Sequence, residues 1–238
     1  MRTVVILGTG TDVGKTYVTI QLAKLLADRT HGTVQAVKPI ESGVNEQQIT
    51  DAERLALVSR PVLPKAHAYA FEPAISPHLA ARRAGVQIKT DTIADWLLQT
   101  RREEALTQND PGIPTWLLVE TAGGVYSPIS DTETNFDLAR ALEPSCWILV
   151  ASDALGVLHN VRATILAMRS MGRMPDLVIL NSPSVRDGST GTNRDEIQRL
   201  GWANVAASIQ RNGSLTAHDA SALLDVLQRH FEPTLLNH

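Results

Sequence analysis

The sequence predicts an α/β fold in which a mainly parallel central sheet carries helices on both faces. Two observations support this prediction. Short apolar runs alternate with longer amphipathic patterns along the chain. Most of these runs are continuous in Val, Ile and Leu, which is typical of strands that are covered on both faces.

Six apolar runs are the predicted strands. In chain order they are Thr3–Leu7, Thr33–Val37, Thr115–Val119, Trp147–Ala151, Leu177–Leu180 and Asn204–Ala207. Between them, apolar residues recur at spacings of three or four, which predicts helices. These helical patterns include Ala52–Val58 with Asp51 as a candidate N-cap, a segment that starts at Thr90 or Asp91, Leu158–Met168, and Ala220–Leu227 after Thr216. The polar stretch Ser182–Asn193 predicts a long loop.

Length and composition favour one soluble, cytoplasmic domain over residues 1–238. The formal net charge of −3 argues against a nucleic-acid partner, and no apolar stretch is long enough for a membrane span. A single cysteine, Cys146, excludes an internal disulfide framework, and we expect it to be a small buried hydrophobe. The histidines show no spacing typical of a zinc site.

Polar or glycine-rich residues follow five of the six runs. They are Gly8–Thr16, Lys38, Glu120, Ser152-Asp153 and Asn181. Ligands of parallel α/β sheets bind beyond the carboxyl ends of the strands, so we expect these residues to meet at one edge.

The segment Gly8–Thr16 reads Gly-Thr-Gly-Thr-Asp-Val-Gly-Lys-Thr and predicts a P-loop NTPase-type fold. Glycines let successive backbone N–H groups face a phosphate, Lys15 would reach the outer phosphates, and the Thr16 hydroxyl would bind Mg²⁺. The first glycine lies one residue earlier than in the usual P-loop pattern. A dinucleotide-binding loop is the competing interpretation, but its third glycine would fall at Val13.

Three charged residues could complete a phosphoryl-transfer site. Lys38 follows the second strand and is a candidate second cation. Glu120 ends the third strand, where a carboxylate that directs Mg²⁺ belongs. Asp51 is either another such carboxylate or the helix cap named above.

At these residues the sequence resembles the dethiobiotin synthetase family. The matching motifs are Gly8-x5-Gly14-Lys15-Thr16, Lys38-Pro39 with Ser42-Gly43, Asp51, Ser76-Pro77-His78-Leu79-Ala80-Ala81, and Glu120 with Ala122-Gly123-Gly124. The five-residue gap between the loop glycines is itself a feature of that family. The resemblance implies an ATP- and Mg²⁺-dependent ring closure of 7,8-diaminopelargonic acid with CO₂. It proceeds through a carbamate and a carbamic–phosphoric anhydride, and family members work as homodimers.

The resemblance also implies roles for individual residues. Lys15, Lys38 and Thr11 are the implied catalytic residues. The residues implied to contact the nucleotide are Asp12, Val13, Gly14, Lys15, Thr16, Tyr17 and Asn181. Substrate contacts fall to Ser42, Gly123, Leu155 and Gly156, and the metal ligands are Thr16, Asp51 and Glu120.

The chain departs from the family pattern after Leu155-Gly156, where His159-Asn160 stand in reversed order, and at Asn181-Ser182, where Asn-Asp is usual. Two other functions remain open. A partitioning-type P-loop ATPase would carry a signature lysine where this chain has Gly10. An ATP-dependent amidoligase would normally bring a glutaminase domain, for which the chain has no room, so it would require a separate glutaminase partner.

Overall fold

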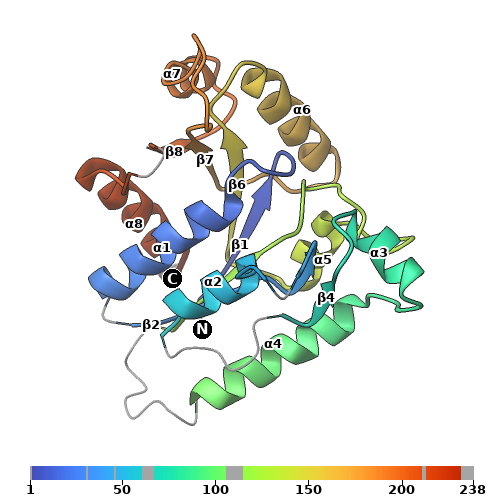
Figure 1. Cartoon of the computed structure of the whole chain (residues 1–238). Helices are drawn as coiled ribbons and strands as arrows, with labels where there is room; N and C mark the ends of the chain where they lie inside the picture. Colours follow the sequence, from blue (N-terminus) through green and yellow to red (C-terminus); the bar gives the residue numbers. More distant parts are fainter. Residues whose placement is uncertain are drawn as a thin grey trace.

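The computed structural model describes residues 2–30, 32–45, 47–60, 67–105, 115–210 and 213–231, and its main feature is a six-stranded parallel sheet (Figure 1). In sheet order the strands are β2 (Thr33–Val37), β5 (Thr115–Glu120), β1 (Arg2–Gly8), β6 (Cys146–Ser152), β7 (Leu177–Asn181) and β8 (Val205–Ile209). All five pairings are parallel, so every strand ends at the same edge of the sheet. The predicted fold class is confirmed.

Successive residues of β1 point to opposite faces of the sheet. Val4 and Ile6 pack in a core with α1 (Lys15–Thr30) and α8 (Ala217–Phe231). Val5 and Leu7 pack in a second core with α5 (Asn135–Ala141), α6 (Val157–Ser170) and α7 (Asn193–Arg199). Helices therefore cover both faces (Figure 1), which explains why the strands read as continuous apolar runs.

All six predicted strands are present. The last one lies at Val205–Ile209 rather than Asn204–Ala207, and the register shifts between Val178 and Ile179 where it pairs with β7. Cys146 is fully buried within β6, as expected of a small hydrophobe.

The helix predicted over Ala52–Val58 is α2 (Asp51–Val58), and its cap differs from the prediction. The N-cap is Thr50, whose hydroxyl accepts a hydrogen bond from the Glu53 backbone N–H at 3.1 Å. Asp51 is the first helical residue, so its side chain is free of the capping role. The predicted cap at Thr216 is confirmed, because its hydroxyl accepts from the Asp219 N–H at 3.1 Å.

A small second sheet was not predicted. It joins β3 (Ile40–Ser42) and β4 (Tyr69–Phe71) in parallel and lies near α3 (Pro77–Arg83). Strands of three residues are too short for a periodic signal. With α4 (Thr90–Ala105), these elements surround a third apolar core beside β5. In the part of the chain that the structure describes, no helix has the length and apolarity needed to cross a membrane.

Candidate nucleotide and reaction site

The loop between β1 and α1 has the backbone of a phosphate-binding loop. Gly14 has φ of +89°, and a Cβ there would lie 2.0 Å from the Asn181 Nδ2 atom, so both the conformation and the close approach require glycine. The Lys15 ammonium donates a hydrogen bond to the Gly10 carbonyl at 3.0 Å. It thus folds back over the loop where a triphosphate would lie.

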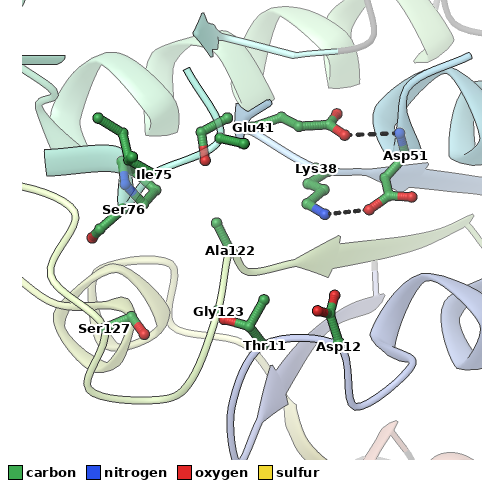
Figure 2. Close-up of a pocket in the computed structure, with 13 residues that line it drawn as sticks. Thr11, Asp12, Lys38, Glu41, Asp51, Ile75, Ser76, Ala122, Gly123 and Ser127 are labelled. Atoms are coloured by element: carbon green, nitrogen blue, oxygen red, sulfur yellow. Dashed lines mark hydrogen bonds and ion pairs between the residues drawn. The ribbon is translucent and has the colours of Figure 1, made fainter. Parts of the chain in front are cut away.

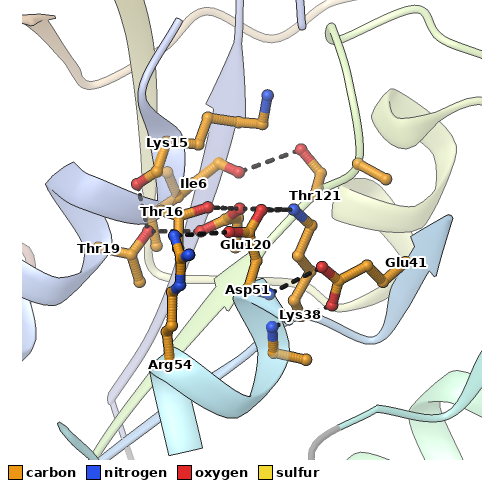
Figure 3. A network of polar contacts seen from close by, with 12 residues as sticks. Ile6, Lys15, Thr16, Thr19, Lys38, Glu41, Asp51, Arg54, Glu120 and Thr121 are labelled. Carbon is orange, nitrogen blue, oxygen red and sulfur yellow. Dashed lines mark hydrogen bonds and ion pairs between the residues drawn. The ribbon is translucent and has the colours of Figure 1, made fainter. Parts of the chain in front are cut away.

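Glu120, at the end of β5, is the centre of a buried polar network (Figure 3). Its Oε1 atom accepts from the Thr16 hydroxyl at 2.8 Å, and its Oε2 atom accepts from the Thr19 hydroxyl at 3.1 Å. The Lys38 ammonium lies 3.2 Å from Glu120 Oε1 and 2.7 Å from Asp51 Oδ2. Residues from β5, α1, α2 and the end of β2 therefore converge, as the strand-edge rule predicts.

Burial and neighbouring charge shift the pKa values of this network in different directions. Burial raises the pKa of Glu120, and the nearby Lys38 ammonium offsets this only in part. Burial alone would lower the pKa of Lys38, but the carboxylates of Glu120 and Asp51 outweigh it and raise that pKa. For Asp51, the attraction of Lys38 outweighs burial and lowers the pKa. Burial lowers the pKa of Lys15 to about 8, despite the opposing charge of Glu120.

The oxygen atoms around Lys38 fit a magnesium site. The Thr16 hydroxyl is hydrogen-bonded to Glu120, and carboxylate oxygens of Glu120 and Asp51 both contact the Lys38 ammonium. These hard oxygen donors suit Mg²⁺, which is usually held by one or two carboxylates together with substrate phosphates. The described residues hold no cluster of three or more His, Cys, Asp or Glu that could bind a metal ion.

A cavity of about 520 Å³ opens beside this network (Figure 2). It brings together six residues of the predicted site: Thr11, Asp12, Lys38, Ser42, Asp51 and Gly123. Gly123 has φ of +82°, and a Cβ there would come within 2.7 Å of the Ser127 hydroxyl. The wall of the cavity that faces the loop Ala122–Ser127 is therefore close-packed, and it offers backbone and hydroxyl groups.

A second cavity of about 290 Å³ lies on the other side of Asp12, next to Gly14, Tyr17 and Asn181. Asn181 donates its amide hydrogen to the Val13 carbonyl at 3.3 Å, and its Oδ1 atom is buried without a partner in the described part of the chain. The Tyr17 hydroxyl donates to the Gly213 carbonyl. An amide oxygen and an aromatic ring beside the P-loop could receive a nucleobase.

Known proteins resemble this chain over nearly its whole length. A family model described as an AAA domain matches residues 2–219. The ATP-dependent dethiobiotin synthetase BioD of Anaeromyxobacter sp. (strain Fw109-5) is 35% identical over 206 residues, which is 84% of this chain and 86% of the relative. The BioD of Saccharopolyspora erythraea is 30% identical over 237 residues, 99% of this chain and 97% of the relative. The chain belongs to the dethiobiotin synthetase family.

Membership of the dethiobiotin synthetase family makes the chain an ATP-dependent ligase. Among solved structures, a ParA family ATPase from Chlorobium tepidum TLS is similar with a TM-score of 0.48 and 13% identity, over 96% of this chain and 88% of that one. A likeness this low carries no argument about function.

Leu155 and Gly156, to which the dethiobiotin synthetase resemblance gave substrate contacts, lie apart from both cavities in the described structure. They precede α6, and Gly156 has φ of +94° as its N-cap. The Leu155 N–H donates to Asp187 Oδ2 at 2.7 Å, while the Leu155 side chain is 85% exposed. In this structure the backbone N–H of Leu155 is therefore bound by the Asp187 carboxylate.

Sequence reasoning missed several residues of this candidate site. Thr19 lies one turn after Lys15, and its hydroxyl contacts Glu120 as described. Its spacing of three from Thr16 places both hydroxyls on one helix face, a signal that could have revealed it. Glu41 and Ser127 also line the first cavity, together with Ser76 of the Ser-Pro-His motif, to which the sequence had given no role in the site. Glu41 lies in the short β3 strand and had no such signal.

Proposed function

We propose that the chain catalyses the ring-closing carboxylation of 7,8-diaminopelargonic acid with CO₂ to dethiobiotin, with ATP as co-substrate and Mg²⁺ as cofactor. One observation supports this reaction above all. The Lys38 ammonium borders a cavity that lies beside the P-loop and is distinct from the cavity near Asn181. A nucleotide in the latter would leave the larger cavity free for a second substrate.

In the first step, one amine nitrogen of the diamine attacks CO₂. An N–C bond forms as one C=O π bond of CO₂ opens onto its oxygen, and the amine proton passes to solvent, which gives a carbamate. The hydroxyls of Thr11 and Ser42 and the backbone around Gly123 border the cavity. They would hold the carbamate by hydrogen bonds and so set the position of its oxygen for the next step.

In the second step, that carbamate oxygen bonds to the γ-phosphorus of ATP while the bond from this phosphorus to ADP breaks. The transition state is loose and anionic, so charge neutralisation and positioning supply most of the catalysis. Lys15 and Lys38 would provide this positive charge from two sides. Mg²⁺, held by Thr16, Asp51 and Glu120, would neutralise charge on the β- and γ-phosphates.

In the last step, the second amine attacks the carbonyl carbon of the mixed anhydride. The new N–C bond closes the ureido ring, the C–O bond to phosphate breaks, and the amine proton passes to solvent. Enclosure of the diamine in the cavity would keep both amines near the same carbon, which favours ring closure over hydrolysis.

A direct assay tests this function. The protein is incubated with Mg-ATP, bicarbonate and 7,8-diaminopelargonic acid, and ADP is followed together with dethiobiotin. Equal amounts of the two products, both dependent on the diamine, support the proposal. ADP release that does not depend on the diamine would refute it.

The metal ligands are tested by Asp51→Asn, which should raise the Mg²⁺ concentration needed for half-maximal turnover. Asp91→Asn is the matched control, because Asp91 also lies in the first turn of a helix but is exposed and away from the cavity. A metal titration that is the same in both variants would rule out Asp51 as a ligand.

We also propose that residues 1–238 work as one domain in a homodimer, which sedimentation would test.

A further inference from the structure

Glu41 is a buried carboxylate with an unexpected set of partners. It lies in β3, lines the larger cavity and is only 8% exposed. Its Oε1 atom accepts from the Asp51 backbone N–H at 2.8 Å, and its Oε2 atom accepts from the Ala52 N–H at 3.0 Å. Both oxygens therefore bind the start of α2 rather than pointing at the cavity centre (Figure 2).

The start of α2 also carries a capping box in which Glu41 takes no part. Thr50 and Glu53 form a reciprocal capping box on the exposed side, in which Glu53 Oε2 accepts from the Thr50 N–H at 2.8 Å. This box satisfies the third N–H of the helix, whereas Glu41 takes the first two. Two carboxylates thus accept backbone hydrogen bonds at the start of α2, the exposed Glu53 and the buried Glu41.

Glu53 and Glu41 differ in the residue to which each carboxylate is hydrogen-bonded. Glu53 contacts Thr50, which takes no part in the site. Glu41 contacts the backbone of Asp51, whose side chain meets Lys38 at 2.7 Å. Since Lys38 and Glu41 lie three residues apart, one short segment holds Asp51 at both its backbone and its carboxylate (Figure 2).

We propose that Glu41 is a positioning residue for the metal–nucleotide complex, which it serves by fixing the backbone of Asp51 and thereby the direction of the Asp51 carboxylate. This role rests on the proposed function, in which Asp51 is a ligand of Mg²⁺. Groups that orient metal ligands matter nearly as much as the ligands, and their loss commonly weakens metal binding by about 10- to 100-fold.

The test measures metal binding directly in the full chain. Mn²⁺ replaces Mg²⁺, and free Mn²⁺ is followed by electron paramagnetic resonance in the presence of a non-hydrolysable ATP analogue. Glu41→Ala should weaken Mn²⁺ binding about 10-fold. Glu41→Gln should have an intermediate effect, because its amide keeps one acceptor oxygen for the two N–H donors.

Glu53→Ala is the matched control, since it removes a carboxylate from the same helix start without touching Asp51. It should lower the melting temperature while leaving the Mn²⁺ affinity within about twofold of wild type, as a change outside the metal site would. If Glu41→Gln and Glu53→Ala bind Mn²⁺ equally well, Glu41 is only a helix cap and the inference is overturned. The glutamine variant keeps this comparison possible if Glu41→Ala does not fold.

Asp51→Asn separates failure of this inference from failure of the proposed function. If Asp51→Asn weakens Mn²⁺ binding but the Glu41 variants do not, only the positioning role is wrong. If Asp51→Asn has no effect either, the metal assignment itself fails and takes the positioning role with it. In turnover, loss of positioning should raise the Mg²⁺ concentration that is needed for half-maximal rate.

Discussion

Replacing Lys38 with methionine removes a charge from the middle of the buried network while keeping most of its volume. The Lys38 ammonium lies 3.2 Å from Glu120 Oε1 and 2.7 Å from Asp51 Oδ2. The side chains of Lys38 and Glu120 are 11% and 0% exposed. Without the ammonium, the buried Glu120 carboxylate and the partly exposed Asp51 carboxylate lose the cation that both of them contact.

The expected loss of stability follows from these distances. At an effective dielectric constant of about 20, the attraction between Lys38 and Glu120 is about 5 kcal/mol, and burial of both charges offsets part of it. Removal of one partner from a buried ion pair typically costs about 3–5 kcal/mol. Because the Asp51 side chain is 34% exposed, solvent screens its share of the attraction and the lower value applies. A loss of about 3 kcal/mol corresponds to a drop of about 6–12 °C in Tm for a chain of this size.

Magnesium should recover the stability but not the turnover. In Lys38→Met no ammonium competes for the carboxylates, so Mg²⁺ alone can bind Asp51 and Glu120. At 100 times its Kd, a ligand adds about 2.7 kcal/mol, which would restore most of the loss. Turnover should remain at least about 100-fold lower, because the positive charge that stabilises the transferred phosphoryl group is missing.

Thermal melts by circular dichroism, without and with Mg²⁺, measure the first effect, and product formation measures the second. Lys24→Met is the control, since Lys24 is an exposed lysine of α1. The reasoning is refuted if Lys38→Met melts at the wild-type temperature and gains no more from Mg²⁺ than Lys24→Met does. Near-normal turnover would show that Lys38 has no role in phosphoryl transfer.

Three further predictions concern other parts of the chain. Burial raises the pKa of Cys146 to about 12, so its thiolate at pH 8 is about 1000-fold scarcer than that of an ordinary thiol. A chromogenic thiol reagent should therefore react with it only after unfolding, and rapid reaction in the native state would contradict its burial. Gly14→Ala should lower the Tm and abolish binding of an ATP analogue. Adding Asn181→Ala to this variant should restore part of the Tm but not the binding, because it relieves the clash with Asn181 while φ at residue 14 stays positive. Asp187→Ala should speed hydrogen exchange at the Leu155 amide in mass spectrometry, whereas unchanged exchange would mean that this hydrogen bond protects nothing.

The convergence of the charged network could be predicted from the sequence. Lys38 and Glu120 each follow a strand, and parallel strands end at one edge, so chemistry and topology indicated the same place. Asp51 was left open between a metal ligand and a helix cap. The structure resolves half of this question by giving the cap to Thr50, which leaves the Asp51 carboxylate available to Lys38.

The remaining features depend on contacts between residues that are distant in sequence. Glu41 reaches the start of α2 ten residues later, through a strand of three residues that has no detectable periodicity. Asp187 reaches the Leu155 amide across 32 residues, from a loop that reads only as polar. Local propensity cannot show such contacts, because they are set by how the sheet edge and its loops pack.

The small sheet of β3 and β4 explains how one segment can supply both a cation and a positioning carboxylate. Pro39 separates Lys38 from β3, and its carbonyl accepts from the N–H groups of Ala68 and Tyr69, both at 2.9 Å. These bonds fix the chain between the end of β2 and β3, so Lys38 and Glu41 reach α2 from one anchored segment. A shift of this segment would move the ammonium and the carboxylate together. The charge that Asp51 faces and the direction of its carboxylate are therefore coupled. The changes in metal-binding free energy caused by Lys38 and Glu41 variants should not add up in the double variant.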